Sequence, residues 1–332
     1  MTPGNAAALA SALIALATAS AAPAAAQAPL TPPTGFAAEL FGEGTFSTGL
    51  YELAPTFTAD GRTAYFTVST PAYGRLHMIM ETRWDGRRWS TPRIAPFSGR
   101  WGEADPLISP DGRRLFFLSR RPAPGRAAER TDFDIWYVER SGDGWGEPVH
   151  VPSASGSSDE HYASVAADGT LYIAAIRPDS RNQGDIYRVP LVNGVYGEPE
   201  NLGPAINAPD RHDTTPYIAP DQSYMIFGSR GRPDQRVASL DLYVSFRRNG
   251  IWTEARPLGD IVNTWRTEYC PTVSADGRYL YFTSERGFAD RPQEKALTTA
   301  EWNRMLNGPG NGLGDSYRIE LARVWAALGE AP

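Results

Sequence analysis

Short apolar stretches recur along most of the chain, each bounded by Gly, Pro, Asp or Ser residues. Five of them follow an Asp-Gly or Asp-Gln pair after one or two intervening residues and carry aromatic or aliphatic side chains suited to strands. Apolar residues at helical spacing are nearly absent before residue 298. This pattern predicts an all-β chain. The five stretches are Ala64-Tyr65-Phe66, Leu115-Phe116-Phe117, Leu171-Tyr172-Ile173, Met225-Ile226-Phe227 and Leu280-Tyr281-Phe282.

The turns before these stretches belong to a repeat with spacings of 51, 57, 53 and 55 residues. An acid stands eight residues before each turn aspartate, and an apolar residue stands three before it. Glycine after the aspartate supplies the positive φ that tight hairpin turns require. The turns are centred on Asp60, Asp111, Asp168, Asp221 and Asp276. The preceding acids are Glu52, Glu103, Glu160, Asp213 and Glu268.

Each unit continues with signs of two further strands. A third strand begins at His77, Asp134, Asp185, Asp241 or Asp315, and Trp89, Trp145, Tyr196 or Trp252 precedes a fourth. Four antiparallel strands in about 50 residues are typical of a propeller blade. The fifth unit lacks its own fourth strand, so we assign that place to residues 37–41 from the N-terminal side. The sequence therefore predicts a five-bladed β-propeller over residues 36–328, closed by an N-terminal strand, with a tail at 329–332. A sixth, degenerate blade is the structural alternative.

The repeat resembles a known family. The run from Ser109 to Phe117, with Asp134-Ile135-Trp136 after it, is similar to the TolB-like, WD-repeat-like propeller repeat of exported bacterial proteins. The resemblance covers residues 36–321. It implies a binding or scaffolding module of the cell envelope that recognises a peptide, a glycan or an envelope protein. TolB itself has an α/β domain before its propeller, which has no counterpart here, so the resemblance does not extend to a Tol role.

The N-terminal segment indicates export. Residues 1–26 carry no charged side chain, contain an apolar stretch around Leu13 and Ile14, and end in Ala24-Ala25-Ala26. This is the pattern of a signal peptide cleaved near Ala26, followed by a linker at 27–35. The apolar stretch is too short to span a membrane, so we expect no transmembrane segment. We expect a periplasmic or secreted monomer. Its single cysteine, Cys270, allows no internal disulfide.

The net charge of −6 argues against a nucleic-acid partner, because such binding needs a clustered basic surface. Candidate chemistry must then lie on the propeller faces. The inner strands start on one face, together with the long loops at 120–133, 177–184, 229–240 and 285–314. Binding residues collect on such loops, so we take this loop-rich mouth as the candidate site. Its residues are Glu52, Glu103, Asp105, Glu160, His161, Tyr162, His212, Asp213, Glu268, Tyr269 and Glu285.

The acids of this set also have a structural interpretation. In a simple hairpin the residue nine after each turn aspartate lies opposite the acid. That rule predicts the pairs Glu103/Arg120, Glu160/Arg177 and Asp213/Arg230, unless a bulge shifts the register. Glu52, Glu268 and Glu285 receive no opposite cation, although Arg266 and Arg286 are close in sequence. Clustered carboxylates can hold a hard cation, so a divalent cation at this seam is a second possibility. No other cofactor is implied.

Two further features bear on function. His161 and His212 fall on neighbouring blades at the same mouth, and together with nearby carboxylates they are candidates for a zinc or acid-base site, unless they point apart. Thr298 and Glu301 have capping-box spacing, which predicts a short helix ending at Gly308, either packed over blade 5 or forming a partial lid.

The leading function is a non-catalytic binding module. The alternative is a glycan-acting hydrolase or lyase, which requires two carboxyls about 5 to 9.5 Å apart across an open pocket.

Overall fold

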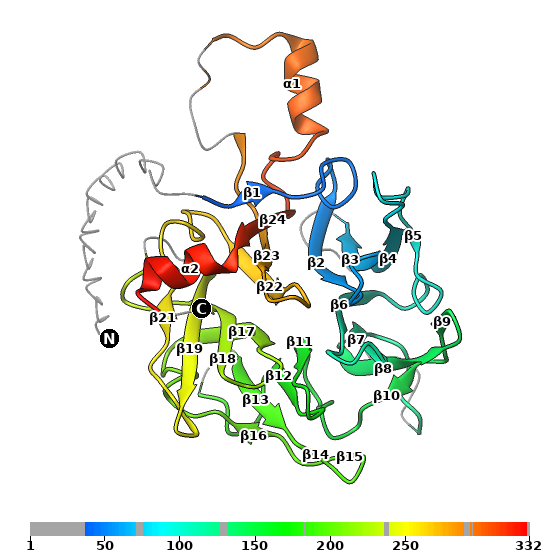
Figure 1. The fold of residues 1–332 in the computed structure, drawn as a ribbon, viewed down its shortest axis with the longest axis vertical. Helices are drawn as coiled ribbons and strands as arrows, with labels where there is room; N and C mark the ends of the chain where they lie inside the picture. The colour runs from blue at the N-terminus through cyan, green and yellow to red at the C-terminus, as the bar shows by residue number, and fades with distance from the viewer. Residues whose placement is uncertain are drawn as a thin grey trace, which may run out of the picture. The chain divides into compact units, whose positions relative to one another are not determined.

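The computed structural model describes residues 37–70, 76–125, 132–181, 184–235, 239–288, 293 and 295–330. The predicted signal peptide at 1–26 and linker at 27–35 lie outside the described residues. Five antiparallel four-stranded sheets succeed one another around a central channel, which confirms the five-bladed β-propeller (Figure 1). The described residues contain no sixth blade, which we had considered as an alternative.

Each blade uses its first strand nearest the channel and its fourth at the rim. Blade 1 consists of β2 (Tyr51–Phe57), β3 (Thr63–Ser69), β4 (His77–Arg83) and β5 (Arg93–Ile94). Blade 2 consists of β6 (Glu103–Ile108), β7 (Arg114–Ser119), β8 (Asp134–Ser141) and β10 (Val149–His150). Blade 3 consists of β11 (Glu160–Val165), β12 (Leu171–Ala175), β13 (Asp185–Val189) and β16 (Glu200–Asn201). Blade 4 consists of β17 (His212–Ile218), β18 (Tyr224–Arg230), β19 (Asp241–Arg248) and β21 (Arg256–Pro257).

Blade 5 closes the ring. Its strands are β22 (Glu268–Val273), β23 (Tyr279–Ser284), β24 (Asp315–Glu320) and the N-terminal β1 (Glu39–Leu40). β1 pairs antiparallel with β24, and the Phe41 N–H donates to the Ser316 carbonyl at 2.8 Å. The predicted closure by an N-terminal strand is therefore confirmed. The N-terminal and C-terminal strands of the propeller therefore pair within one sheet, and blade 5 is built from both.

The turn between the first two strands has the same geometry in every blade. The aspartate carboxylate accepts the N–H of the residue two positions later, at 2.9–3.0 Å in four blades and 3.1 Å in blade 5. The intervening residue has a positive φ, which ranges from 61° at Gln222 to 84° at Gly169. These turns define one face of the propeller, called here the turn face.

The inner strands contain a feature that the sequence pattern did not predict. Each has one residue in the left-handed region, two positions after the repeat acid, with φ between 45° and 56°. The pairing register shifts at or beside this residue in all five inner strands. Each shift is a bulge that re-aims one side chain. The five residues are Ala54, Asp105, Tyr162, Thr215 and Cys270.

The hydrophobic core lies between neighbouring blades rather than within one. One aromatic side chain beyond the third strand packs against the preceding blade at each interface. Three of them lie in two-residue hairpin strands, namely β9 (Gly144–Trp145), β15 (Val195–Tyr196), which pairs with β14 (Leu191–Val192), and β20 (Ile251–Trp252). Trp89 takes this place in blade 1 and Trp325 in blade 5. Trp325 belongs to α2 (Leu321–Leu328), which thus replaces the hairpin of blade 5.

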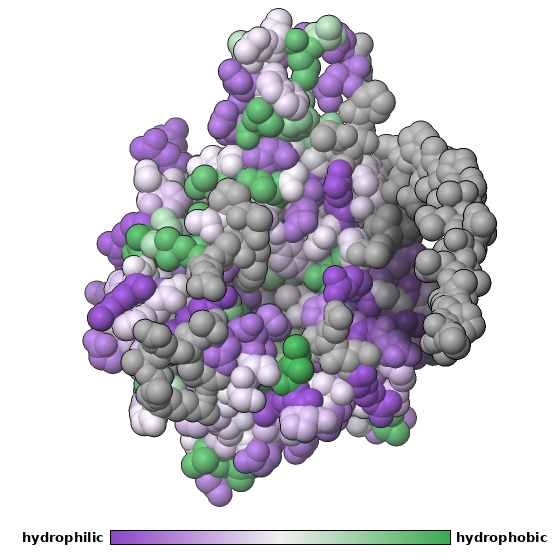
Figure 2. All heavy atoms as spheres, turned by 180° about the vertical axis from the view of Figure 1, so that it is seen from behind, coloured by the Kyte–Doolittle hydropathy of each residue, from purple (hydrophilic) through white to green (hydrophobic). Residues whose placement is uncertain are grey.

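The predicted loop helix is present as α1 (Thr299–Leu306), with the capping box between Thr298 and Glu301. None of its residues is buried, so it does not form the packing patch over blade 5 that we considered. It extends beyond the ring of blades (Figure 1). On the face seen from behind, hydrophobic residues form small patches among hydrophilic ones (Figure 2).

Candidate functional site

The five repeat acids at the loop-rich mouth are buried, with at most 1% of their surface exposed. Each accepts a backbone N–H from the loop just before its own strand. The donors are Thr48 to Glu52 at 3.2 Å, Gly99 to Glu103 at 2.9 Å, Gly156 to Glu160 at 2.8 Å, Ala208 to Asp213 at 3.2 Å and Thr264 to Glu268 at 2.9 Å. A carboxylate used in this way fixes the connection between two blades. The arrangement supports the structural interpretation of these acids.

The predicted cross-strand pairs are wrong in register. Each bulge adds an unpaired residue to the inner strand, so the residue opposite the acid comes earlier in the second strand than predicted. Glu103 lies opposite Ser119, and Asp213 lies opposite Ser229. The arginines that reach the acids come from further along the loop. Glu103 pairs with Arg121 at 3.2 Å instead of Arg120, and Asp213 pairs with Arg232 at 2.9 Å instead of Arg230. Glu160 and Arg177 do form an ion pair, at 4.0 Å, although Ala175 is the residue opposite Glu160.

The simple register predicted three carboxylates without a partner at the seam between blades 5 and 1. This prediction is wrong, because each of the three has a partner. Glu268 lies opposite Ser284 rather than Glu285, and it pairs with Arg286 at 3.3 Å. Glu285 accepts a hydrogen bond from the Tyr51 hydroxyl, while Glu52 accepts one from the Thr48 hydroxyl. Burial raises the pKa of both Glu52 and Glu268. Each acid accepts hydrogen bonds from donors of its own. This arrangement supports a structural role at the seam over a cation site.

The bulged residues bring polar groups to the channel axis. Asp105 is buried, with 4% of its surface exposed, and this burial raises its pKa to about 7. The Cys270 sulfur lies 4.0 Å from the Asp105 Oδ1, and the Tyr162 hydroxyl donates to the Pro271 carbonyl at 3.0 Å. Tyr269 donates to the Tyr51 hydroxyl at 2.8 Å. Of this cluster, Tyr51 and Cys270 were missing from the predicted set, because only the bulge places Cys270 beside Asp105.

The two histidines do not assemble a recognisable metal site. His161 is partly buried, and this burial lowers its pKa, while the Asp159 carboxylate acts in the opposite direction. His212 lies at the start of β17, beside Gly184. Among the residues that the structure describes, no group of three or more His, Cys, Asp or Glu side chains has the geometry to hold a metal ion. The ligand-binding role of the mouth residues stays a prediction.

Three cavities lined by described residues open on the turn face instead. One, of about 670 Å³, lies between blades 2 and 3 and is called here the cleft. Another, of about 400 Å³, lies between blades 5 and 1. A third, of about 180 Å³, enters the channel and is lined by residues of all five blades, including Thr56, Leu107 and Tyr217. These cavities were not predictable from the sequence, because the turns on this face are short.

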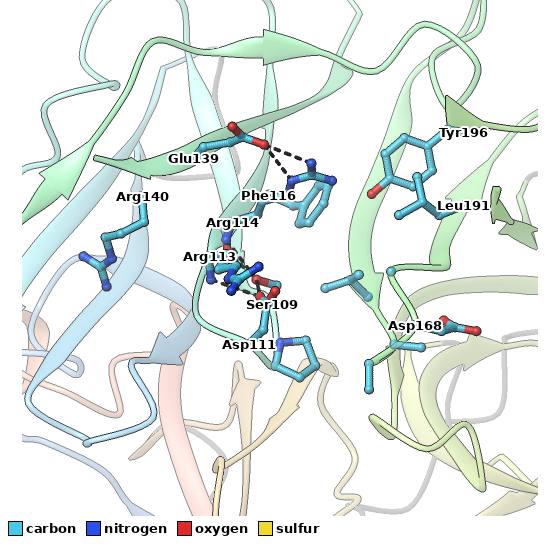
Figure 3. A pocket seen from close by; sticks show the side chains of 15 residues that line it. Ser109, Asp111, Arg113, Arg114, Phe116, Glu139, Arg140, Asp168, Leu191 and Tyr196 are labelled. Atoms are coloured by element: carbon cyan, nitrogen blue, oxygen red, sulfur yellow. Dashed lines mark hydrogen bonds and ion pairs between the residues drawn. The ribbon is translucent and has the colours of Figure 1, made fainter. Parts of the chain in front are cut away.

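The cleft combines charged groups with apolar walls (Figure 3). Arg114 reaches it from β7 and is held by Glu139, whose Oε1 accepts from Nε at 3.1 Å and from Nη2 at 2.9 Å. Tyr196 and Leu191 face Arg114 from blade 3. Burial raises the pKa of Tyr196 to about 12. Asp111 lines the lower part of the cleft in this view, and Phe116, Val165 and Leu191 supply the apolar surface.

Comparison with known proteins finds only distant structural similarity. No protein-family model matches the chain, and no curated protein matches it. Solved structures match at low identity. A protein provisionally described as TolB from Agrobacterium tumefaciens is 17% identical, with a TM-score of 0.47 over 82% of this chain and 90% of that one. A protein of unknown function from Dyadobacter fermentans is 10% identical, with a TM-score of 0.49 over 86% of this chain and 100% of that one.

An enzyme is also among the solved structures that match this chain. The endo-arabinase of Bacteroides thetaiotaomicron is 13% identical, with a TM-score of 0.45 over 72% of this chain and 91% of that one. Identity this low says nothing about shared chemistry, since one fold carries many functions. None of the helices in the described ranges is long and apolar enough to cross a membrane.

Proposed function

We propose that the protein is a binding module that takes a polypeptide segment into the cleft between blades 2 and 3. The observation that supports this most is the composition of the cleft. Its volume of about 670 Å³ is typical of ligand sites. Guanidinium donors, carboxylate acceptors and apolar side chains all line its walls. These groups complement the carbonyls, the N–H groups and the apolar side chains of a peptide.

Arg114 is the residue best placed to orient such a ligand. Glu139 fixes its guanidinium through two hydrogen bonds, so little side-chain freedom remains to be lost on binding. The ion pair is also partly exposed, at 30% for Arg114 and 57% for Glu139. Its remaining N–H groups can therefore donate to a peptide carbonyl or carboxylate. The apolar surface of Phe116 and Leu191 lies within the same cleft and suits a hydrophobic side chain.

The glycan-hydrolase alternative gains no comparable support. It requires two carboxyls that face one open pocket across a fixed gap. The repeat acids on which it relied are buried and accept backbone N–H groups in all five blades. A module that binds without bond cleavage is therefore the better interpretation of this site.

The test uses peptides selected against the full chain from a random 12-residue library and measured by calorimetry. The Arg114→Ala variant should bind the selected peptides at least tenfold more weakly, a loss of about 1.4 kcal/mol. The matched control is Arg188→Ala. Arg188 forms the analogous ion pair with Glu200 at 2.8 Å, with exposures of 31% and 58%, but does not line the cleft.

Three outcomes would count against the proposal. The library could yield no peptide that binds in calorimetry, or the selected peptides could bind Arg114→Ala and the wild type equally. Equal binding would move the site away from the cleft. Loss of binding in both arginine variants would point to a general charge effect instead.

A further inference from the structure

The cavity between blades 5 and 1 has a chemistry that the cleft lacks. It occupies the equivalent position at another blade interface, again on the turn face, and six aromatic side chains line it. We call it the aromatic groove. The six are Phe41, Phe57, Trp84, Trp89, Tyr279 and Tyr281.

The aromatic side chains form a continuous surface. The Trp84 and Trp89 rings lie 5.4 Å apart between centroids, Trp89 and Phe57 are 6.1 Å apart, and Phe57 and Tyr281 are 4.7 Å apart. Phe57 and Tyr281 belong to the core, whereas Trp84 is 36% exposed. An indole that stays accessible beside a cavity of about 400 Å³ is available to a ligand.

Polar groups at the rim are held in place by the turns. The Asp60 Oδ1 accepts from the Thr58 hydroxyl at 2.6 Å and from the Arg62 N–H at 3.0 Å. The Asp276 Oδ1 accepts in the same way from Ser274 at 2.5 Å and from the Arg278 N–H at 3.1 Å. These hydrogen bonds lower the pKa of both aspartates, so both are ionised at neutral pH.

Cationic groups accompany these carboxylates. Arg318 lines the groove, and its Nε donates to Glu39 at 2.7 Å. The guanidinium groups of Arg62 and Arg278 act on Asp60 and Asp276 respectively. Donors and acceptors therefore both occur at or near the rim. An organic cation would be opposed by these arginines, and an anion would be opposed by the aspartates. A neutral molecule whose hydroxyls both donate and accept matches the rim.

We propose that the aromatic groove binds a neutral saccharide. The C–H face of a sugar ring packs on the indole of Trp84, because the face of an aromatic ring is the negative part of its quadrupole and C–H bonds present positive edges. Hydroxyls of the same ring donate to Asp60 or Asp276 and accept from Arg318. The site is independent of the cleft, since the two cavities share no lining residue.

The experiment titrates the full chain with cellohexaose, maltohexaose, xylohexaose and N-acetylchitohexaose in separate calorimetric runs. We expect binding of at least one hexasaccharide, weakened at least tenfold by Trp84→Ala and less by Trp84→Phe, which keeps an aromatic face. Trp302→Ala is the matched control, because Trp302 is 45% exposed on α1, away from the groove. Melting temperatures establish that the variants remain folded.

The proposal is overturned if none of the four saccharides binds at millimolar concentration, or if binding survives Trp84→Ala. Choline is titrated in parallel, and binding of choline without any saccharide would make the groove a cation site instead. Arg114→Ala must leave saccharide binding unchanged. This arm separates failure of the groove from failure of the proposed peptide site.

Discussion

Asp105 is a residue of the channel whose pKa lies far above that of an exposed aspartate. Its carboxyl is buried at the axis, with the Cys270 sulfur 4.0 Å from Oδ1. An unfolded aspartate titrates near 3.9, whereas burial raises the pKa of Asp105 to about 7. The folded protein therefore holds this proton more tightly than the unfolded chain does. It should lose stability as the pH rises from about 4 to about 7.

This gives a pH-dependent prediction. Asp105→Asn removes the cost of ionising a buried carboxyl, so the variant should be more stable than the wild type by roughly 2–4 kcal/mol at pH 8. The gain should shrink toward zero near pH 4. Urea unfolding at several pH values measures it. Asp85→Asn serves as the control, since the N–H groups of Arg88 and Arg87 lower the pKa of that carboxyl. A gain that is independent of pH would contradict the assignment.

The contact between Asp105 and Cys270 was not predictable from the repeat pattern. The repeat, with its acid and apolar residue at fixed offsets, led us to include Asp105 and Tyr162 among the residues of the channel mouth. It could not indicate that Cys270 lies next to Asp105. That proximity depends on the left-handed φ of 51° at Asp105 and 49° at Cys270, which non-glycine residues rarely adopt. The same bulges displaced the predicted arginine partners by one or two residues.

At the scale of the element, the blade interface is the unit of stability. An aromatic side chain from outside the four-stranded sheet packs on the preceding blade, as in the hydrogen bond of 2.8 Å from Trp145 to the Tyr65 hydroxyl. The sequence marked these residues only as signs of a fourth strand. Their contacts were not predictable, because the partner lies in another repeat. In blade 5 the role passes to α2, where Trp325 lies 5.0 Å from Tyr224 and 5.6 Å from Phe246.

Trp325→Ala tests whether α2 belongs to the blade 4/5 interface. Trp325 is 6% exposed, and removing a buried tryptophan costs about 3–5 kcal/mol. Trp325→Phe should lose less, since it keeps a ring against Tyr224. The control is again Trp302→Ala, whose exposed position predicts a change within about 0.5 kcal/mol. Denaturant unfolding compares the three. Equal stability of Trp325→Ala and the wild type would show that α2 is not part of the packed core.

At the scale of the whole molecule, the propeller is a ring closed by two segments distant in sequence. Phe41 connects them, because its ring lies 4.9 Å from Tyr281 and its N–H bonds to Ser316. Ser47 strengthens the same seam, since its hydroxyl accepts the Ser316 N–H at 3.0 Å. The missing fourth strand of the last repeat was enough to predict this closure. The aromatic groove beside it was not predictable, because its walls come from both ends of the chain.

Removing β1 should open the ring. A protein that begins at Gly42 loses the strand pairing of β24 together with the buried Phe41 and Ala38. Its melting temperature should fall by roughly 5–15 °C relative to a protein that begins at residue 32, and the exposed edge of β24 should promote aggregation. A synthetic peptide of residues 35–42 should restore much of the loss when added in excess, because binding to the folded state stabilises it by mass action. The same peptide with Phe41→Ala should restore less. If the shortened protein melts at the same temperature as the longer one, the seam does not hold the ring closed.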